Sequence, residues 1–514
     1  TAQYFAAKAA VGFSTGLRHA LFEHIQKLSF SEMDTVGTST LITRMTSDIN
    51  QTQNGVNLVL RLFLRSPFIV FGAMIMAFTI DVKAALVFVV TIPLLSVVVF
   101  GIMLVSIPLY KKVQSALDKV LGITRENLTG SRVIRAFNKE DDEIADFNNS
   151  NDALTKIQLY VGKISALMNP LTYVIINGAV VVLVWTGAIR VNSGYITQGE
   201  VVALVNYMSQ ILVELIKLAN LIININKSIA CGNRIQAIFE LQPSITDHAV
   251  TPVAEEKTEH SGEVPEVVFS HVGLTYAGAG EESLTDIDFT VKKGETIGII
   301  GGTGSGKSSV VNLIPRFYDA TKGSVQIEGK DVREYSLEEL RGKIGMVLQK
   351  AVLFKGTIRE NMLWGNENAT DEDIMQALEV AQAKEFVDKK EGGLDFEIEQ
   401  GGKNLSGGQR QRMTIARAVV KKPDILILDD SASALDFATD AKLRMAIRDM
   451  ENRATVFIVS QRAASIMYAD KIIVLDDGQI VGMGTHEELL KQCEVYQEIY
   501  YSQLKKTEDE KEGR

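Results

Sequence analysis

The stretch ETIGIIGGTGSGKSSVVNLI, from Glu295 to Ile314, decides the fold of one half of this chain. It reads as an aliphatic strand, a glycine-rich loop and a helix, and Gly301–Ser308 fits the pattern G-x-x-x-x-G-K-[ST]. Glycines let the backbone wrap closely, so that its N–H groups point at phosphate oxygens at a helix N-terminus. In this pattern Lys307 reaches the β- and γ-phosphates and Ser308 is a ligand of Mg²⁺. The stretch therefore predicts a nucleotide-binding P-loop.

A second stretch, ILILDDSASALD from Ile425 to Asp436, supplies carboxylates. Its four aliphatic residues predict a buried strand that delivers Asp429 to the Mg²⁺ shell in the Walker-B role. Asp430 follows at a position where a carboxylate can polarise the attacking water. Around both stretches, short aliphatic runs separated by glycines alternate with helical patterns. This alternation predicts an α/β P-loop ATPase domain with a largely parallel sheet.

Length and composition set the wider limits. A chain of 514 residues exceeds one ordinary core, so we expect two or more domains. The net charge of −10 argues against a nucleic-acid binder held by a basic surface. The two cysteines, Cys231 and Cys493, are far apart in the sequence, which argues against a disulfide framework or a zinc site.

The first 240 residues have the composition of a membrane domain. Ala84–Tyr110 contains no charged residue in 27 positions, and Ile164–Ile189 contains none in 26. About 20 apolar residues span the hydrocarbon core of a bilayer, so both segments are long enough. Residues 58–80 and 201–225 are two further candidates, and residues 1–17 resemble the remaining part of a fifth. The pattern favours an all-α transmembrane domain over buried helices of a soluble protein.

Charge predicts the orientation of these spans. The long polar segments 18–57 and 111–163 are helical in pattern, and the second is rich in Lys and Arg, which marks the cytoplasmic side. The short Asp81–Lys83 connection and the loop 190–199 then face outward. Because the chain begins with Thr1 inside a helical pattern, we expect it to be a fragment that lacks its original N-terminus.

Two ionisable residues interrupt the span at 201–225. Glu214 and Lys217 lie at positions i and i+3, so they share one face of a helix. An ionisable pair inside a span is costly and usually faces a cavity or a partner helix. The sequence leaves two interpretations open, namely a substrate pathway and a structural ion pair.

The domain organisation follows from these composition shifts. We expect a transmembrane domain over residues 1–240, a polar linker over 241–264, a nucleotide-binding domain over 265–505 and a charged tail over 506–514.

A third motif lies between the two nucleotide motifs. Leu405-Ser406-Gly407-Gly408-Gln409 places a second anion-binding turn before a helix. Following a Walker A and preceding a Walker B, it resembles the signature of ATP-binding cassette (ABC) proteins. The membrane half resembles the exporter type, in which six long helices precede one nucleotide-binding domain with a helical subdomain. This chain departs from the exporter pattern in lacking the first span and part of the second.

The resemblance implies site residues beyond the three motifs. The ATP-binding residues are Tyr276, which would stack on adenine, and Gly301, Gly302, Thr303, Gly304, Ser305, Gly306, Lys307, Ser308 and Ser309. The implied Mg²⁺ ligands are Ser308, Gln349 of the Q-loop and Asp429. The implied D-loop is Ser433, Ala434, Leu435 and Asp436. Segments 30–37 and 130–138 resemble coupling helices.

Two positions at the implied catalytic centre depart from the family pattern. The family has a glutamate general base after the Walker-B aspartate, where this chain has Asp430. It also has a switch-loop histidine where this chain has Gln461. Aspartate is shorter by one methylene, and a misplacement near 1 Å can cost on the order of 100-fold in rate. Glutamine donates a hydrogen bond but cannot shuttle a proton as imidazole can. Together with Gln349, these catalytic positions predict a site that binds ATP well and hydrolyses it slowly.

The family clamps each ATP between the Walker A of one domain and the signature of the other. The intact signature of this chain would then complete a competent site on a different partner. The resemblance implies one half of a heterodimeric multidrug-type exporter in a bacterial cell membrane, with a cytoplasmic nucleotide-binding domain. Its partners would be a second half-transporter, membrane lipids and an amphipathic substrate, with no nucleic acid. The alternatives are a slow homodimeric exporter and a nucleotide-binding regulatory subunit.

Overall fold

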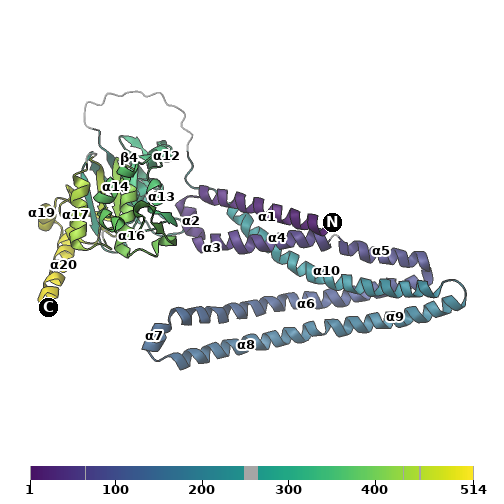
Figure 1. The fold of residues 1–514 in the computed structure, drawn as a ribbon. Coiled ribbons are helices and arrows are strands. Elements are labelled where there is room, and N and C mark those ends of the chain that lie inside the picture. Colours follow the sequence, from purple (N-terminus) through teal and green to yellow (C-terminus); the bar gives the residue numbers. More distant parts are fainter. Residues whose placement is uncertain (1, 64, 248–263, 432, 451–452, 513–514) are drawn as a thin grey trace. The chain divides into compact units, whose positions relative to one another are not determined.

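The computed structural model describes residues 2–63, 65–247, 264–431, 433–450 and 453–512 (Figure 1). The chain divides into two compact units. The helical unit comprises Thr1–Gln26 and Ser39–Leu241, and the second unit comprises Lys27–Thr38 and Gln242–Arg514. The chain therefore passes between the units three times.

Long helices make up the helical unit. They are α1 (Ala2–Lys27), α3 (Thr38–Thr43), the π-helical segment η1 (Arg44–Asp48), α4 (Ile49–Leu58), the π-helical segment η2 (Val59–Phe63), α5 (Arg65–Ile80), α6 (Val82–Thr129), α7 (Ser131–Ala136), α8 (Glu140–Ala166), α9 (Met168–Asn192) and α10 (Gln198–Phe239). Figure 1 shows α6 and α8 running side by side and joined by the short α7.

Four continuous helical stretches of the described chain are long and apolar enough to cross a membrane. They are Thr38–Ile80, Val82–Thr129, Glu140–Asn192 and Gln198–Leu218. These stretches include the uncharged segments 84–110 and 164–189. Their common core is apolar, and its fully buried members include Phe88, Leu95, Leu183, Leu204 and Met208. Since the outer faces of these helices carry many exposed apolar side chains, the composition suits lipid rather than water.

Specific polar contacts join helices of this apolar unit. Asp81 caps α6 by accepting from the backbone N–H of Ala84 at 3.1 Å, and it receives Arg190 through two hydrogen bonds of 2.7 and 3.1 Å. Glu214 is buried and accepts from Ser66 Oγ at 2.8 Å and from Lys217 Nζ at 3.0 Å. The predicted Glu214–Lys217 pair therefore forms, with Ser66 as an additional partner.

The second unit is built around two main sheets. Its strands are β1 (Val267–Leu274), β2 (Leu284–Val291), β3 (Thr296–Gly301), β4 (Lys322–Ile327), β5 (Lys330–Asp331), β6 (Ile344–Val347), β7 (Gly356–Thr357), β8 (Glu397–Ile398), β9 (Ile425–Asp429), β10 (Thr455–Val459), β11 (Lys471–Asp476) and β12 (Gln479–Gly484). The six-stranded sheet has the order β12-β11-β3-β10-β9-β6, and only β12 is antiparallel to its neighbour. The second sheet, β2-β1-β4-β5, is antiparallel.

Helices surround these sheets. They are α2 (Phe30–Val36), α11 (Lys307–Leu313), η3 (Val332–Glu334), α12 (Leu337–Gly342), α13 (Ile358–Leu363), α14 (Asp371–Val380), α15 (Lys384–Asp388), η4 (Gly393–Asp395), η5 (Gln400–Gly402), α16 (Gly407–Val419), α17 (Phe437–Arg448), α18 (Ala463–Ile466), α19 (His486–Gln492) and α20 (Glu494–Glu512). Between β6 and β9 the chain forms the helical subdomain, in which Met362, Leu378 and Met413 share one buried cluster.

Strand β9, which precedes the two aspartates, is apolar throughout because the parallel sheet is covered on both sides. Ile425 and Ile427 of β9 belong to one core cluster, whereas Leu426 and Leu428 belong to the other. A strand buried on both faces reads as a continuous apolar run, as ILIL does here. The predicted α/β domain with a largely parallel sheet is confirmed.

Helix α2 belongs to the second unit although it lies early in the sequence. The ring of Phe30 packs against that of Phe317 with centroids 4.5 Å apart, and the Tyr318 hydroxyl donates to Asp34. This short helix falls within the segment 30–37 that resembles a coupling helix.

Candidate functional site

The P-loop connects β3 to α11 at the carboxyl edge of the parallel sheet. Gly304 and Gly306 have φ of +85° and +91°, a region that side chains disfavour. At Gly301 a Cβ atom would lie 2.1 Å from the carbonyl oxygen of Leu475, so that only glycine fits beside β11. The glycines of the sequence pattern therefore serve both turn geometry and close packing.

Lys307 is held inside this loop. Its Nζ donates to the carbonyl oxygens of Gly301 at 3.0 Å and Gly302 at 2.5 Å, and to Ser305 Oγ at 3.4 Å. Burial lowers the pKa of Lys307, while the carboxylates of Asp429 and Asp430 act in the opposite direction. The loop thus presents a desolvated ammonium group, which interacts strongly with an anion.

Ser308 and Asp429 form the oxygen-rich side of the site. Ser308 Oγ donates to Asp429 Oδ1 at 3.0 Å, although the two residues are 121 positions apart. The parallel pairing of Val459 with Asp429 places this carboxylate at the strand end. Burial raises the pKa of Asp429, the Ser308 hydrogen bond lowers it and the neighbouring Asp430 raises it. Hydroxyl and carboxylate oxygens are the ligands that Mg²⁺ prefers, so this pair fits a divalent cation.

Asp430 stands beside Asp429 in a strained conformation. Its φ is +44°, which is uncommon outside glycine and costs on the order of 1–3 kcal/mol. Its N–H donates to the carbonyl oxygen of Val459 at 3.0 Å, and its Oδ2 accepts from Gln349 Nε2 at 3.5 Å. Burial raises the pKa of Asp430. The strand end therefore turns this carboxylate toward the Q-loop glutamine.

One cavity of about 790 Å³ brings the predicted positions together. From the sequence-predicted set it is lined by Tyr276, Thr303, Gly304, Gly306, Lys307, Ser308, Ser309, Gln349, Asp429, Asp430 and Gln461. Both departures from the family pattern, Asp430 and Gln461, thus face the same space as the P-loop. Gly301, Gly302 and Ser305 are not among the described lining residues, and Ser305 is buried near Lys307.

Tyr276 lies at the rim of this cavity. Its hydroxyl donates to Ser309 Oγ at 2.8 Å, and its ring meets that of Tyr318 edge-on at 5.0 Å. Burial raises the pKa of Tyr276, so the phenol stays neutral. Two contacts fix the ring, which leaves an aromatic surface available to a planar base.

The signature lies apart from this cavity. Among the described residues, those lining it do not include Leu405–Gln409. Ser406 caps α16 through two reciprocal hydrogen bonds with Gln409. The Ser406 hydroxyl accepts from the backbone N–H of Gln409 at 3.3 Å, and the backbone N–H of Ser406 donates to Gln409 Oε1 at 3.0 Å. The signature of this chain therefore lies outside its own P-loop cavity.

The predicted D-loop is bonded to Asp430 and to Arg462, the neighbour of Gln461. Ser433 Oγ donates to the carbonyl oxygen of Asp430 at 2.9 Å. Arg462, next to Gln461, donates to the carbonyl oxygens of Leu435 at 3.5 Å and Ser433 at 3.4 Å. Asp436 caps α17 by accepting from Thr439 N at 2.8 Å. The segment is therefore bonded to Asp430 and to the residue that follows Gln461.

Part of the cavity wall was not predicted from the sequence. Glu281, Glu282 and Ser283 before β2, and the turn Asp477–Gly478 between β11 and β12, also line it. An Asp-Gly pair between two aliphatic runs is a hairpin signal that the sequence carries. Its position beside Ser283 comes from sheet packing: a Cβ at Gly478 would lie 2.7 Å from the carbonyl oxygen of Ser283.

Comparisons with known proteins agree with this geometry. Residues 1–215 match the family model of the ABC transporter transmembrane region, and residues 284–433 match the ABC transporter model. A Mycobacterium bovis protein described as an uncharacterized ABC transporter ATP-binding protein is 38% identical over 98% of this chain and 86% of its own length. An ATP-dependent lipid A-core flippase of Desulfotalea psychrophila is 33% identical, covering 95% and 84%.

Two further matches bear on the type of transporter. A putative multidrug export ATP-binding/permease protein of Bacillus subtilis is 34% identical over 97% of this chain and 85% of its own length. The solved structure of a bacterial Atm1-family ABC exporter with ATP bound superposes with a TM-score of 0.75, covering 96% of this chain and 86% of that one. At 23% identity, that structure shows a shared fold.

The four apolar helices and the P-loop domain therefore form one functional molecule, an integral membrane protein whose cytoplasmic ATPase is coupled to transport. Exporters of this architecture act as dimers of half-transporters. This chain belongs to the ABC transporter family, as an exporter with a transmembrane region fused to its nucleotide-binding domain.

Proposed function

We propose that this chain is one half of a heterodimeric ABC exporter, with slow hydrolysis at its own Walker site and an intact signature that completes the partner's site. The observation that carries the proposal is the joint placement of Asp430 and Gln461 on the wall of the P-loop cavity. Both departures from the family pattern then act on the same bound nucleotide. The proposed domains are the transmembrane residues 1–240, the linker 241–264 and the nucleotide-binding residues 265–505.

Binding of ATP rests on residues that match the family. The P-loop N–H groups and Lys307 would bind the phosphates, Tyr276 would stack on adenine, and Ser308 with Asp429 would hold Mg²⁺. Bound Mg²⁺ supplies charge neutralisation at the β- and γ-phosphates. The hydrogen-bonded pair Ser308–Asp429 supports this assignment because both oxygens already lie side by side.

We expect slow hydrolysis because the side chain of Asp430 is short and the amide of Gln461 does not titrate. Asp430 is one methylene shorter than the glutamate of the family pattern, and its contact to Gln349 is at the outer limit of a hydrogen bond. A general base must lie within hydrogen-bond reach of the proton that it takes. Gln461 can orient a group by donating a hydrogen bond, but it has no titrating nitrogen. We therefore infer that this site holds ATP longer than it hydrolyses it.

The intact signature points to an unlike partner. Ser406 and Gln409 cap α16 reciprocally, which presents the N-terminus of a 13-residue helix outside this chain's own cavity. Facing a partner's Walker A, that terminus would bind the partner's γ-phosphate. A homodimer would carry two weakened sites, whereas a heterodimer would pair one slow site with one fast site.

The relatives support an amphipathic substrate. One is named a lipid A-core flippase and another a putative multidrug export protein. We infer export of amphipathic small molecules, lipids or peptides. Closure of the nucleotide-binding domains on ATP would be converted to alternating access through the segments 30–37 and 130–138.

Co-expression tests the heterodimer. The ATPase rate of the full-length protein is measured in proteoliposomes with and without a candidate partner half-transporter. We expect slow turnover by the protein alone and fast turnover by the complex. In the complex, Asp430→Ala should lose much less activity than removal of the partner's glutamate base. Fast turnover by the protein alone, or equal losses in the complex, would refute the slow site.

The same preparation separates the alternatives. A homodimeric exporter would purify without a partner half-transporter and would still move substrate slowly across the vesicle membrane. A regulatory subunit would bind ATP and change the activity of another protein, without flux of its own.

A further inference from the structure

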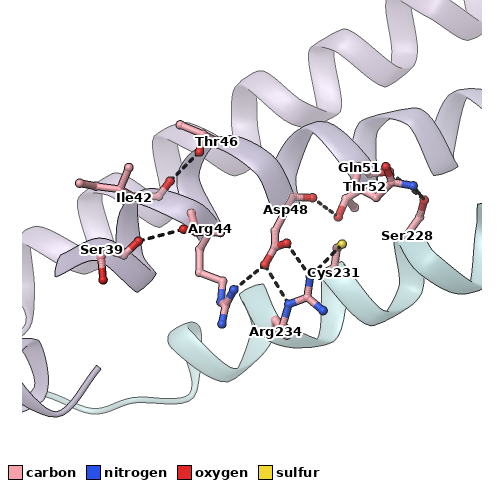
Figure 2. Close-up of polar contacts among 11 residues, drawn as sticks. Ser39, Ile42, Arg44, Thr46, Asp48, Gln51, Thr52, Ser228, Cys231 and Arg234 are labelled. Atoms are coloured by element: carbon pink, nitrogen blue, oxygen red, sulfur yellow. Dashed lines mark hydrogen bonds and ion pairs between the residues drawn. The ribbon is translucent and has the colours of Figure 1, made fainter. Parts of the chain in front are cut away.

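A buried carboxylate joins two helices of the helical unit. Asp48 has a side chain only 4% exposed and lies at the end of the π-helical segment η1 (Figure 2). Arg234 of α10 donates to both of its oxygens, from Nη2 at 2.6 Å and Nε at 3.0 Å, and Arg44 Nη1 adds a third bond of 2.8 Å. Arg234 Nη2 also lies 3.1 Å from Cys231 Sγ. The Asp48 carboxylate therefore accepts hydrogen bonds from arginines of both η1 and α10.

The continuous helix formed by η1 and α4 contacts α10 again one and two turns after Asp48. Ser228 Oγ of α10 donates to the carbonyl oxygen of Gln51 at 2.7 Å, which ties it to α4. Gly55 then packs so closely that a Cβ there would lie 2.3 Å from Ser228 Cβ. Helices α4 and α10 are therefore fixed at successive levels, and Figure 2 shows Asp48, Gln51 and Ser228 following one seam between them.

A contact from α1 completes the arrangement. His24 forms a hydrogen bond of 3.0 Å with the carbonyl oxygen of Ile238, and its ring lies 5.5 Å from that of Phe239. Helix α1 leads into residues 27–38 of the second unit, the chain returns at Ser39, and α10 leads out again after Leu241. All three passages between the units are therefore tied together, inside the helical unit, through the last turns of α10.

A contact of this chemistry specifies geometry more than it adds stability. The Asp48 carboxylate is buried and the Arg234 side chain is 46% exposed. An ion pair of this kind adds little net stability, but it can fix register and partner. The bidentate guanidinium adds directional specificity that an apolar contact lacks. The π-helical turn Arg44–Asp48 inserts an extra residue into the helix, and such turns are frequent at functional sites.

We propose that Asp48 and Arg234 are positioning residues of the transport cycle, which make the end of α10 move as one body with α1, α3 and α4. A movement that the second unit delivers through residues 27–38 then reaches α10 together with α4. Without the pair, each passage would respond separately, and ATP binding would be transmitted less completely to the spans. This role goes beyond nucleotide binding and does not depend on which partner completes the transporter.

The test compares backbone hydrogen exchange in α4 and in residues 225–239 of α10, with ATP, Mg²⁺ and orthovanadate as the probe. The variant Asp48→Asn keeps the shape of the side chain and removes its charge. The matched control is Asp118→Asn, the same change at an exposed position of α6 whose side chain accepts from Gln114. ATPase rate and melting temperature are measured on the same full-length samples.

In the wild type and in Asp118→Asn, we expect the probe to slow exchange in α4 and α10 together. In Asp48→Asn, we expect a basal ATPase rate within about threefold of wild type. We expect the slowing of hydrogen exchange in one of the two helices to be at least halved relative to the other. If Asp48→Asn fails to fold, Arg234→Lys decides, because it keeps the charge and loses the two-point contact.

Two results would overturn the proposal. The first is a folded Asp48→Asn or Arg234→Lys protein in which both helices still respond in the wild-type ratio. The second is a parallel fall of melting temperature, ATPase and both exchange responses, since that pattern belongs to a contact that only stabilises the fold.

Discussion

Restoring the two family residues at the catalytic centre should convert a slow site into a fast one. The perturbation is Asp430→Glu combined with Gln461→His, at two positions that line the same cavity as Lys307 and Asp429. Neither change touches the P-loop or the hydrogen bond between Ser308 and Asp429, so ATP affinity should be preserved.

The geometry around Asp430 sets the expected size of the effect. Asp430 Oδ2 lies 3.5 Å from Gln349 Nε2, at the limit of a hydrogen bond. Glutamate extends the carboxylate by one C–C bond of about 1.5 Å. A displacement near 1 Å is worth on the order of 100-fold in rate, which corresponds to about 2.7 kcal/mol in the barrier. We therefore expect kcat to rise on the order of 10- to 100-fold for Asp430→Glu alone, and further for the double variant.

The assay is steady-state phosphate release by the full-length protein in proteoliposomes without an added partner. Binding of a fluorescent ATP analogue, measured in parallel, separates a change in catalysis from a change in affinity. The control is Asp477→Glu, the same lengthening of a carboxylate on the same cavity wall but away from Asp429. It should leave kcat nearly unchanged.

Two outcomes would refute the reasoning. If the wild-type protein alone already hydrolyses ATP at a rate that Asp430→Glu does not raise, the aspartate suffices as it stands. If Asp477→Glu raises kcat as much as Asp430→Glu, the effect of length is not specific to the position after the Walker-B aspartate.

Three further predictions follow from individual contacts. Tyr276→Ala should weaken binding of the ATP analogue by about 1–3 kcal/mol through loss of stacking, whereas Tyr276→Phe, which loses only the bond to Ser309, should lose much less; equal losses would contradict the stacking role. Ser308→Ala should abolish the Mg²⁺ dependence of that binding in a metal titration, and an unchanged Mg²⁺ curve would exclude Ser308 as a ligand. Glu266 is buried, its Oε1 accepts no hydrogen bond from the described residues, and burial raises its pKa. Ionisation of this carboxyl therefore costs stability above the raised pKa, and Glu266→Gln should raise the melting temperature at pH 8 more than at pH 5. A larger gain at pH 5 would contradict this sign.

The nucleotide-binding half could be predicted in detail from local patterns. The P-loop, the Walker-B strand and the signature each combine a strand or helix with turn residues that allow few conformations. Gly304 and Gly306 adopt positive φ, and ILIL is buried on both faces, as the patterns predict. In the same way, uncharged runs long enough to span a bilayer predict membrane helices without any knowledge of their packing.

The cavity wall formed by Ser283 and Asp477–Gly478 could not be predicted, because it depends on how β2 and the β11–β12 hairpin meet. The contact between Asp48 and Arg234 was missed for a related reason. It joins residues 186 positions apart through a π-helical turn. Charged residues near helix ends are ordinarily solvated, so the sequence offered no signal that the Asp48 carboxylate is buried.

The family, the nucleotide chemistry and the two departures at Asp430 and Gln461 could be inferred from the sequence alone, because they depend on residue types at short spacings. The packing of distant segments was needed to show that both departures face one cavity, that Glu214 has Ser66 as well as Lys217 for a partner, and that Asp48 of η1 bonds Arg234 of α10. Local patterns encode which backbone conformations and charges are available. Contacts between distant segments arise only when helices pack in a definite register, which no short stretch of the chain specifies.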